Sequence, residues 1–168
     1  GNDAATAIAE YEGGSEEAFV NMMNRRAQEL MANGTHFMNP HGLHDDNHYT
    51  TAYDLYLIFN ECIKHEDFVN IIQSEAYTAH YTDVDGNSQE ALFTPTNLYA
   101  QGEVDVPENV TIVGGKTGTT DEAGYCLILM EKDSSDNPYI SIVMGASEKP
   151  VLYEDMTSLI EAIPSGQQ

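Results

Sequence analysis

The chain has 168 residues, 41% of them hydrophobic, which is enough to bury a core of ordinary size, and this length favours one domain. Six Lys and Arg against 28 Asp and Glu give a formal net charge of −22 at pH 7, and such a surface repels nucleic-acid phosphates and anionic membranes. The composition therefore argues against nucleic acid as a partner, and no apolar run is long enough to span a bilayer. Cys62 and Cys126 fit no metal-binding C-x-x-C pattern, so we expect two buried thiols and leave a disulfide open.

Helical periodicity dominates the first part of the chain. Each of the first three predicted helices has either a polar capping residue before its apolar stripe or a glycine after it. The helices are a short one ending at Gly13-Gly14, a second capped by Ser15 and running up to Gly34, a third capped by Thr51 with Asp54 and reaching Ile63, and a short fourth around residues 68–72.

The periodicity is lost between residues 35 and 49, which predicts a loop long enough to suspect a function. Its density of possible metal ligands invites a metal hypothesis, but histidine spacings of five, three and four match no common zinc pattern. We therefore expect solvated or backbone-bonded side chains, with no metal and no cofactor. The side chains concerned are His36, His41, His44, Asp45, Asp46 and His48.

Strand patterns follow in the second half. Strands over 77–82 and 91–94 flank the turn signal Asp85-Gly86-Asn87, which predicts a hairpin, and residues 97–107 are interpreted as an acidic connector. An antiparallel meander and a closing helix after Pro150 complete an α+β order of elements. The meander strands are predicted at 110–118, 123–132 and 139–144, with a turn at 134–138, and the buried face of the last helix at Leu152, Met156, Leu159, Ile160 and Ile163.

The stretch 113–120, Val-Gly-Gly-Lys-Thr-Gly-Thr-Thr, sets a cation among glycines and hydroxyls in an acidic chain. β-branched and apolar flanks predict that Lys116 lies on a strand. Glycines at 114, 115 and 118 leave that strand without side chains at these positions, so another backbone can come close. An extended peptide could pair along it while Lys116 and the neighbouring hydroxyls hold a carboxylate.

Two other interpretations compete for this stretch. A phosphate-binding loop, G-x-x-x-x-G-K-[ST], requires glycine at position 110, where the chain has Val110, so the spacing excludes it. A glycine-bearing hairpin strand with a solvated lysine is the plain alternative for a K-T-G tripeptide taken alone.

Four blocks in one order resemble the serine D-alanyl-D-alanine carboxypeptidases, the low-molecular-weight penicillin-binding proteins. The blocks are residues 2–5, 35–43, 48–55 and 114–118, and the resemblance runs over residues 1–163, with 164–168 as the start of a linker or tail. It implies a partial penicillin-binding, β-lactamase-like transpeptidase domain of α+β class, with an antiparallel sheet packed with helices. Such enzymes use three motifs, S-x-x-K, S-x-N and K-T-G.

The resemblance implies roles for the K-T-G residues. Lys116 and the Thr117 hydroxyl would bind the terminal carboxylate of a D-Ala-D-Ala stem peptide, or that of a penicillin. The Thr119 backbone N–H would supply half of an oxyanion hole, and Gly118 would leave the substrate room. Asn2 looks like the last residue of a Ser-Gly-Asn motif that orients the substrate amide. His41 would be a loop organiser or a polar group on the substrate side.

The other motifs are incomplete. No lysine has a serine three positions before it, since Glu61, Val113, Leu129 and Ala146 occupy those places. Ser135-Asp136-Asn137 spells S-x-N but follows K-T-G and precedes Pro138, where these residues are ordinary turn formers. We therefore expect a fragment without the N-terminal part of the catalytic domain and its nucleophile, inert alone, with Gly1 either native or a cloning scar.

The resemblance implies that the whole protein cleaves the terminal D-Ala of peptidoglycan stem peptides through an acyl-serine, without a cofactor, and binds β-lactams. It implies an extracytoplasmic place in the cell envelope, with or without a membrane anchor. Loss of N-terminal strands would expose a sheet edge, so we expect a homodimer through that edge, strand swapping or a marginally stable monomer. The alternatives are a non-catalytic module that binds peptidoglycan peptides or penicillins, and a metal-binding protein built on the histidine loop.

Overall fold

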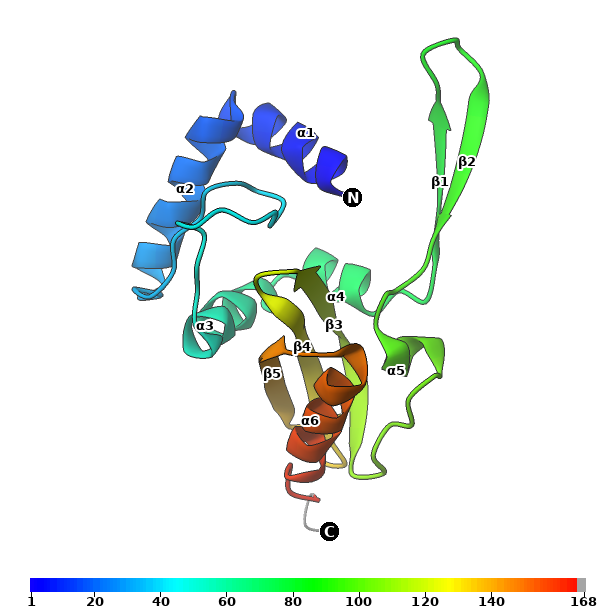
Figure 1. The fold of residues 1–168 in the computed structure, drawn as a ribbon. Helices are drawn as coiled ribbons and strands as arrows, with labels where there is room; N and C mark the ends of the chain where they lie inside the picture. Colours follow the sequence, from blue (N-terminus) through cyan, green and yellow to red (C-terminus); the bar gives the residue numbers. More distant parts are fainter. Residues whose placement is uncertain (166–168) are drawn as a thin grey trace. The chain divides into compact units, whose positions relative to one another are not determined.

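The computed structural model describes residues 1–165, and the chain forms two compact units (Figure 1). Unit 1 contains residues 1–64 and 119–124, and unit 2 contains residues 65–118 and those from 125 on. The short segment 119–124 returns to unit 1 from the middle of unit 2. Each unit is described by itself below.

Unit 1 holds three helices, and their predicted caps are confirmed. Ser15 Oγ accepts a hydrogen bond from the Ala18 N–H at 3.1 Å, and Thr51 Oγ1 accepts one from the Asp54 N–H at 3.1 Å. These bonds satisfy backbone donors that a helix start leaves open. The helices are α1 (Asn2–Gly13), α2 (Glu16–Glu29) and α3 (Ala52–Cys62).

The second helix ends earlier than predicted. The sequence suggested a helix up to Gly34, but α2 ends at Glu29 because Met31 adopts a left-handed conformation with φ of 63°. The Ala32 N–H then donates to the Ala27 carbonyl oxygen at 2.9 Å, a bond that closes the helix end. A non-glycine residue in this conformation gives no signal that sequence periodicity can detect.

Unit 2 contains the strands. The hairpin prediction is confirmed by six antiparallel residue pairs between the first two strands, from Tyr77↔Phe93 to Thr82↔Ser88, although the second strand begins at Ser88 instead of residue 91. This hairpin projects from the rest of unit 2 (Figure 1). The elements are α4 (Glu66–Ile72), β1 (Tyr77–Thr82), β2 (Ser88–Phe93), α5 (Leu98–Gln101), β3 (Val110–Thr120), β4 (Gly124–Asp133), β5 (Pro138–Ala146) and α6 (Lys149–Glu161).

The predicted meander is confirmed as a three-stranded sheet in the order β3-β4-β5. The β4 and β5 strands pair antiparallel, with Ile128 opposite Ile142. Helix α6 covers one face of this sheet, and the core between them excludes water almost completely. Its most buried side chains are Leu127, Leu129, Leu152, Met156 and Ile160.

Two details of unit 2 correct the sequence interpretation. The connector 97–107 contains the short helix α5, which Asn97 caps by accepting from the Tyr99 N–H at 3.1 Å. On α6, Tyr153 is buried whereas Leu159 is 45% exposed, because the buried stripe is rotated toward the Tyr153 ring that packs against Tyr99 of α5. Tertiary contact with α5 therefore decides which face of α6 is buried.

The two cysteines are half-buried rather than fully buried, Cys62 in unit 1 and Cys126 in unit 2, and both are present as thiols. Burial raises the pKa of the Cys62 thiol above its ordinary value. Among residues 1–165, no helix combines the length and apolar content needed to cross a membrane.

Candidate active site

Lys116 lies on β3, as predicted, and its side chain is exposed. Its ammonium donates to the Thr117 carbonyl oxygen, a contact within its own strand. Thr117, the next residue, is half-buried, and Gly118 after it is exposed. The strand thus presents a cation and a hydroxyl at its surface beside a residue that has no side chain.

The three glycines around Lys116 have different surroundings. A Cβ atom at Gly114 would lie 2.1 Å from the Ile72 carbonyl oxygen at the end of α4, and one at Gly115 would lie 2.0 Å from the Ile128 carbonyl oxygen of β4. The backbone that comes close at these two positions is therefore the protein's own. A Cβ atom at Gly118 would have no such neighbour within 4 Å among residues 1–165, so the space beside it is open.

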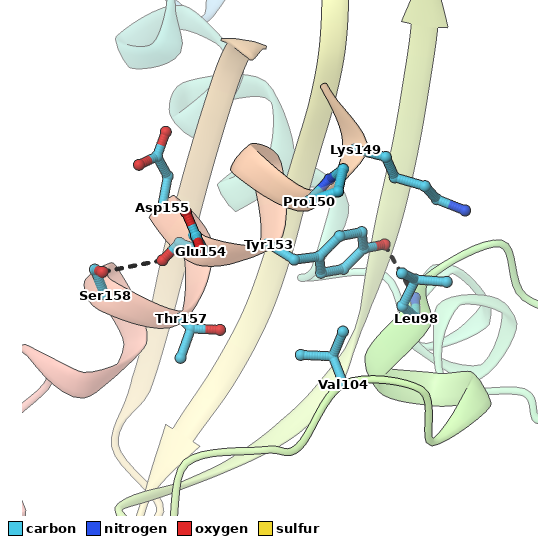
Figure 2. A pocket seen from close by; sticks show the side chains of 9 residues that line it. All are labelled: Leu98, Val104, Lys149, Pro150, Tyr153, Glu154, Asp155, Thr157 and Ser158. Carbon is cyan, nitrogen blue, oxygen red and sulfur yellow. Dashed lines mark hydrogen bonds between the residues drawn. The ribbon is translucent and has the colours of Figure 1, made fainter. Parts of the chain in front are cut away.

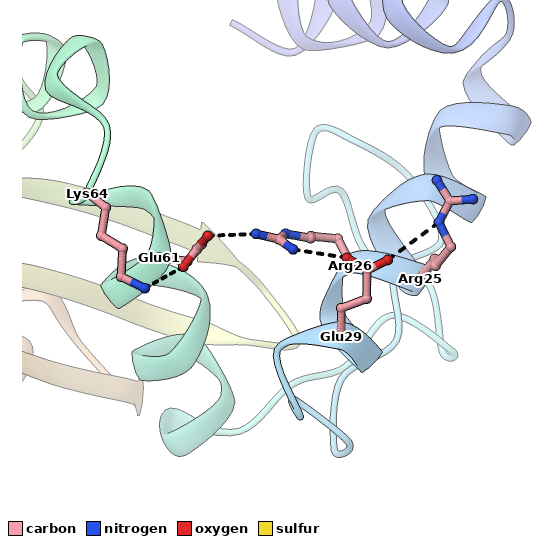
Figure 3. A network of polar contacts seen from close by, with 5 residues as sticks. All are labelled: Arg25, Arg26, Glu29, Glu61 and Lys64. Carbon is pink, nitrogen blue, oxygen red and sulfur yellow. Dashed lines mark hydrogen bonds and ion pairs between the residues drawn. The ribbon is translucent and has the colours of Figure 1, made fainter.

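Most cations of this acidic chain are neutralised by carboxylates. Arg26 lies between two of them, with Nη1 3.0 Å from Glu29 Oε2 and Nη2 2.6 Å from Glu61 Oε1 (Figure 3). The hydrogen bond with Glu29, and after it the interactions with Glu61, raise the pKa of Arg26. The cations paired in this way within residues 1–165 are Arg25, Arg26, Lys64 and Lys132.

Lys116 is not paired with a carboxylate in this way. Within the described part of the chain, neither Lys116 nor Lys149, the first residue of α6, has a carboxylate within 4.0 Å. Because the neighbours of Lys116 along β3 are glycines and threonines, they offer hydroxyls and backbone but no negative charge. The Lys116 ammonium is therefore able to take an anionic ligand.

A hydroxyl from outside the predicted site lies against Thr117. Thr96, which follows β2 and precedes α5, has its Oγ1 atom 2.5 Å from Thr117 Oγ1. The sequence interpretation missed this residue, since nothing in a Thr-Asn pair at the start of an acidic connector indicates which strand it will contact. The only sequence signal available was the capping preference of Asn97 for a helix start.

Helix α5 is fixed to α6 by two tyrosines. The Leu98 N–H donates to the Tyr153 hydroxyl at 3.0 Å (Figure 2). Tyr99 Oη lies 2.7 Å from Thr157 Oγ1. The Tyr99 and Tyr153 rings meet edge to face, with their centroids 5.4 Å apart. A pocket of about 750 Å³ lies beside this contact, and Lys116 is not among the residues that line it.

The remaining predicted site residues lie elsewhere. Asn2 is exposed in the first turn of α1, and His41 belongs to the loop of unit 1, where its Nε2 atom is 3.8 Å from Glu16 Oε1. Thr119 lies on β3 but belongs to the 119–124 segment of unit 1. The structure therefore brings Lys116, Thr117 and Gly118 together on one strand, with Thr119 following directly along it.

The histidines of the loop are engaged in contacts within unit 1. His41 Nδ1 accepts from the Leu43 N–H at 3.2 Å, and His48 Nδ1 accepts from the Met38 N–H at 3.2 Å. Backbone bonds between His36 and Tyr49 close the base of the loop. Burial lowers the pKa of His48, so its neutral, accepting form is favoured. In residues 1–165 no three metal-ligating side chains converge, so the metal-binding alternative finds no site there.

The Ser135-Asp136-Asn137 sequence is a turn, as predicted. Asp133 Oδ1 accepts from the Ser135 N–H at 2.8 Å and from the Asn137 N–H at 2.9 Å, and Asp136 has φ of 62°. The Asn137 side chain, whose Nδ2 donates to Asp133 Oδ2 at 2.8 Å, together with these backbone bonds holds the pKa of Asp133 below its ordinary value. The motif therefore shapes the β4–β5 connection.

A family model described as D-alanyl-D-alanine carboxypeptidase, peptidase S11, matches residues 1–148. The chain belongs to this family. The resemblance inferred from the four sequence blocks is thereby confirmed.

Curated relatives of this carboxypeptidase-family chain agree with the match. D-alanyl-D-alanine carboxypeptidase DacF of Bacillus subtilis (strain 168) is 34% identical over 161 residues, covering 96% of the chain and 39% of DacF. DacC of Escherichia coli (strain K12) is 30% identical over 160 residues, covering 95% of the chain and 36% of DacC. The chain thus spans well under half of the length of these relatives.

Solved structures of the family share the fold. The crystal structure of the Streptomyces K15 DD-transpeptidase matches with a TM-score of 0.83 and 26% identity, over 95% of this chain and 61% of that one. DacD from Francisella tularensis matches with a TM-score of 0.79 and 25% identity, over 96% and 48%. The predicted α+β class is confirmed. One of these proteins is named as a DD-transpeptidase and the other as a D-alanyl-D-alanine carboxypeptidase, so the non-catalytic binding module gains no support.

Proposed function

We propose that the protein is a peptidoglycan-processing serine carboxypeptidase that removes the terminal D-Ala from stem peptides ending in D-Ala-D-Ala, through an acyl-serine intermediate. The observation that carries this proposal is the unneutralised Lys116 on β3 beside the open position Gly118, in a chain of net charge −22. A cation without a carboxylate partner in such a chain is suited to a ligand that brings its own carboxylate.

The proposed reaction involves two negative charges: the terminal carboxylate of the substrate, and the charge that develops on the scissile carbonyl oxygen. The peptide's terminal carboxylate would bind the Lys116 ammonium and the Thr117 hydroxyl, which fixes the end of the substrate. The scissile carbonyl gains negative charge when a serine attacks it, and the Thr119 N–H would supply one donor to that oxygen. Asn2 would orient the substrate amide, and His41 would organise the loop or contact the substrate as a polar group.

The nucleophile of this reaction lies outside the 168 residues. No lysine here has a serine three positions before it, so the S-x-x-K serine and its lysine base must be supplied by another part of the protein. A β-lactam carries a carboxylate and a reactive amide in one molecule, so it would occupy the same site and acylate the same serine. This predicts penicillin binding by the whole protein.

The proposed substrate places the protein in the cell envelope, outside the cytoplasm, with or without a membrane anchor. We also propose that the sheet recruits a further strand, because β3 and β5 are both edge strands among the described residues. For the isolated 168-residue chain the candidate is a second copy. Sedimentation of that chain should reveal a dimer, and a stable monomer at high concentration would contradict this proposal.

The test uses the full-length protein. Incubation with penicillin should add one covalent adduct per chain in an intact-mass spectrum, and peptide mapping should place it on a serine outside these 168 residues. A diacetyl-Lys-D-Ala-D-Ala peptide should release D-Ala. A folded protein that gives neither an adduct nor D-Ala would refute the proposed function.

A further inference from the structure

The hydrogen bond between the Thr96 and Thr117 hydroxyls has a direction, because only one of the two can donate to the other. Thr96 Oγ1 and Thr117 Oγ1 lie 2.5 Å apart, so one hydroxyl donates and the other accepts. Each threonine has one proton to donate and can accept through its oxygen lone pairs. The direction of this bond therefore decides whether the Thr117 proton is free for a ligand or is used inside the protein.

The proposed ligand settles that direction, because a carboxylate can only accept hydrogen bonds. If Thr117 gives its proton to the carboxylate held by Lys116, the Thr96 hydroxyl has to be the donor within the pair. Resting on the proposed function, we propose that Thr96 is a positioning residue: it donates to Thr117 Oγ1 and so turns the Thr117 proton toward the terminal carboxylate of the substrate. A chain of donors ending on an anion is also strengthened by mutual polarisation.

The surrounding structure fixes Thr96 well enough for this task. Gln101 Nε2 donates to the Pro95 carbonyl oxygen at 2.7 Å, directly before Thr96, and the Asn97 cap that follows is buried. Helix α5 behind them is held on α6 by Tyr99 and Tyr153. These contacts hold the backbone on both sides of Thr96, and the bond to Thr117 orients its exposed hydroxyl before a ligand binds.

The consequence is a preference among peptide ends. An amidated terminus can donate as well as accept, so it can be bound with the Thr96–Thr117 bond in either direction. The Thr117 hydroxyl can donate to a free carboxylate only when Thr96 donates to Thr117. Thr96 should therefore contribute to the selection of peptides with a free terminal carboxylate over their amides.

The experiment compares four forms of the full-length protein: wild type, Thr96→Val, Thr96→Ser and the control Thr94→Val. Val has nearly the shape of Thr without the hydroxyl, Ser keeps the hydroxyl, and Thr94 is an exposed neighbour. Each form is assayed on diacetyl-Lys-D-Ala-D-Ala and on its C-terminal amide. We expect Thr96→Val to lower kcat/KM about tenfold on the free acid, mainly through KM, and less than about twofold on the amide. Thr96→Ser and Thr94→Val should both stay within about twofold of wild type.

Each outcome has a distinct meaning. An equal loss on both peptides in Thr96→Val would show a structural role and overturn the inference, as would no loss on the free acid. Failure of Thr96→Ser to retain activity would overturn it too, because the hydroxyl would not be the group that matters. A wild type that cleaves neither peptide would instead refute the proposed function, and the inference would fall with it.

Discussion

The cations of unit 1 and the lysine of β3 show two uses of positive charge in one acidic chain. Arg26 lies on a helix whose sequence supplies Glu29 one turn later, and Glu61 of α3 completes its neutralisation (Figure 3). Lys116 lies on a strand whose neighbours carry no charge, and Gly118 keeps the space beside it open. A cation surrounded by carboxylates contributes little beyond local structure, whereas a cation left unneutralised retains its attraction for a ligand.

The largest expected effect comes from removing the unneutralised charge. Lys116→Met in the full-length protein should lower kcat/KM for D-Ala-D-Ala hydrolysis about a hundredfold or more, because the substrate carboxylate loses its charged partner. The matched control is Arg26→Met, which removes a charge already neutralised and should leave kcat/KM within about twofold. Equal losses in both variants would remove the distinction between the two kinds of cation.

The second prediction separates packing from ligand space along β3. Gly115→Ala should destabilise the fold by about 3 kcal/mol or more, because its Cβ would meet the Ile128 carbonyl oxygen at 2.0 Å. Gly118→Ala should leave the melting temperature nearly unchanged, because no described residue lies within 4 Å of the added Cβ atom, but it should lower the rate of penicillin acylation. Thermal unfolding beside an acylation assay distinguishes them. A strongly destabilised Gly118→Ala protein would show that this position is not open.

The third prediction extends the comparison to a buried negative charge. Glu131 on β4 is 0% exposed, and neither carboxylate oxygen has a hydrogen bond of normal geometry within residues 1–165. Burial raises its pKa to about 7, against an opposing interaction with Ser141. The folded state then binds the proton more tightly than the unfolded state, whose pKa is near 4.5, so the stability from this group is complete below pH 4.5 and is lost as pH rises to about 7.

Glu131→Gln provides the test, since the amide has the shape of the protonated acid and does not titrate. The unfolding free energy of the variant minus that of wild type should grow by about 2–3 kcal/mol between pH 4.5 and pH 8, measured by urea unfolding across that range. A difference that stays constant with pH would show that Glu131 has an ordinary pKa in the folded protein.

The smallest expected effect lies in the histidine loop. His48 should titrate below its ordinary pKa of 6.5 in an NMR pH series, because burial disfavours its charged form. A folded pKa below the unfolded one means that the contribution of His48 to stability is present above pH 6.5 and is lost as pH falls through the folded value. Titration at or above pH 6.5 would contradict the accepting role of its Nδ1 atom toward Met38.

Local signals made much of this fold predictable. Ser15 and Thr51 cap helices through atoms three residues away, and Gly86 marks its hairpin by a left-handed φ of 85°. The sequence did not predict helix α5, because this helix has only four residues and is held by contacts with Tyr153 and Thr157 of α6, far along the chain. No local pattern reports such contacts.

The candidate site was predictable in part for the same reason. The Lys-Thr-Gly motif at Lys116 consists of consecutive residues, so the sequence alone identifies it. The β-branched and apolar residues on either side predict that it lies on a strand. The Thr96–Thr117 contact joins residues 21 positions apart and depends on how α5 packs, so the sequence alone could not indicate it. The surroundings of Gly114 and Gly115 likewise depend on α4 and β4.

The glycines of β3 also govern how mutational data on this protein should be interpreted. Substitutions at positions 114 and 115 are expected to abolish activity by unfolding the sheet, and those at 116 to 118 by removing the ligand contacts of a folded protein. A saturation scan scored by growth or activity alone would return one uninterrupted intolerant stretch. Scoring the same library for protein abundance as well would divide that stretch in two, between Gly115 and Lys116.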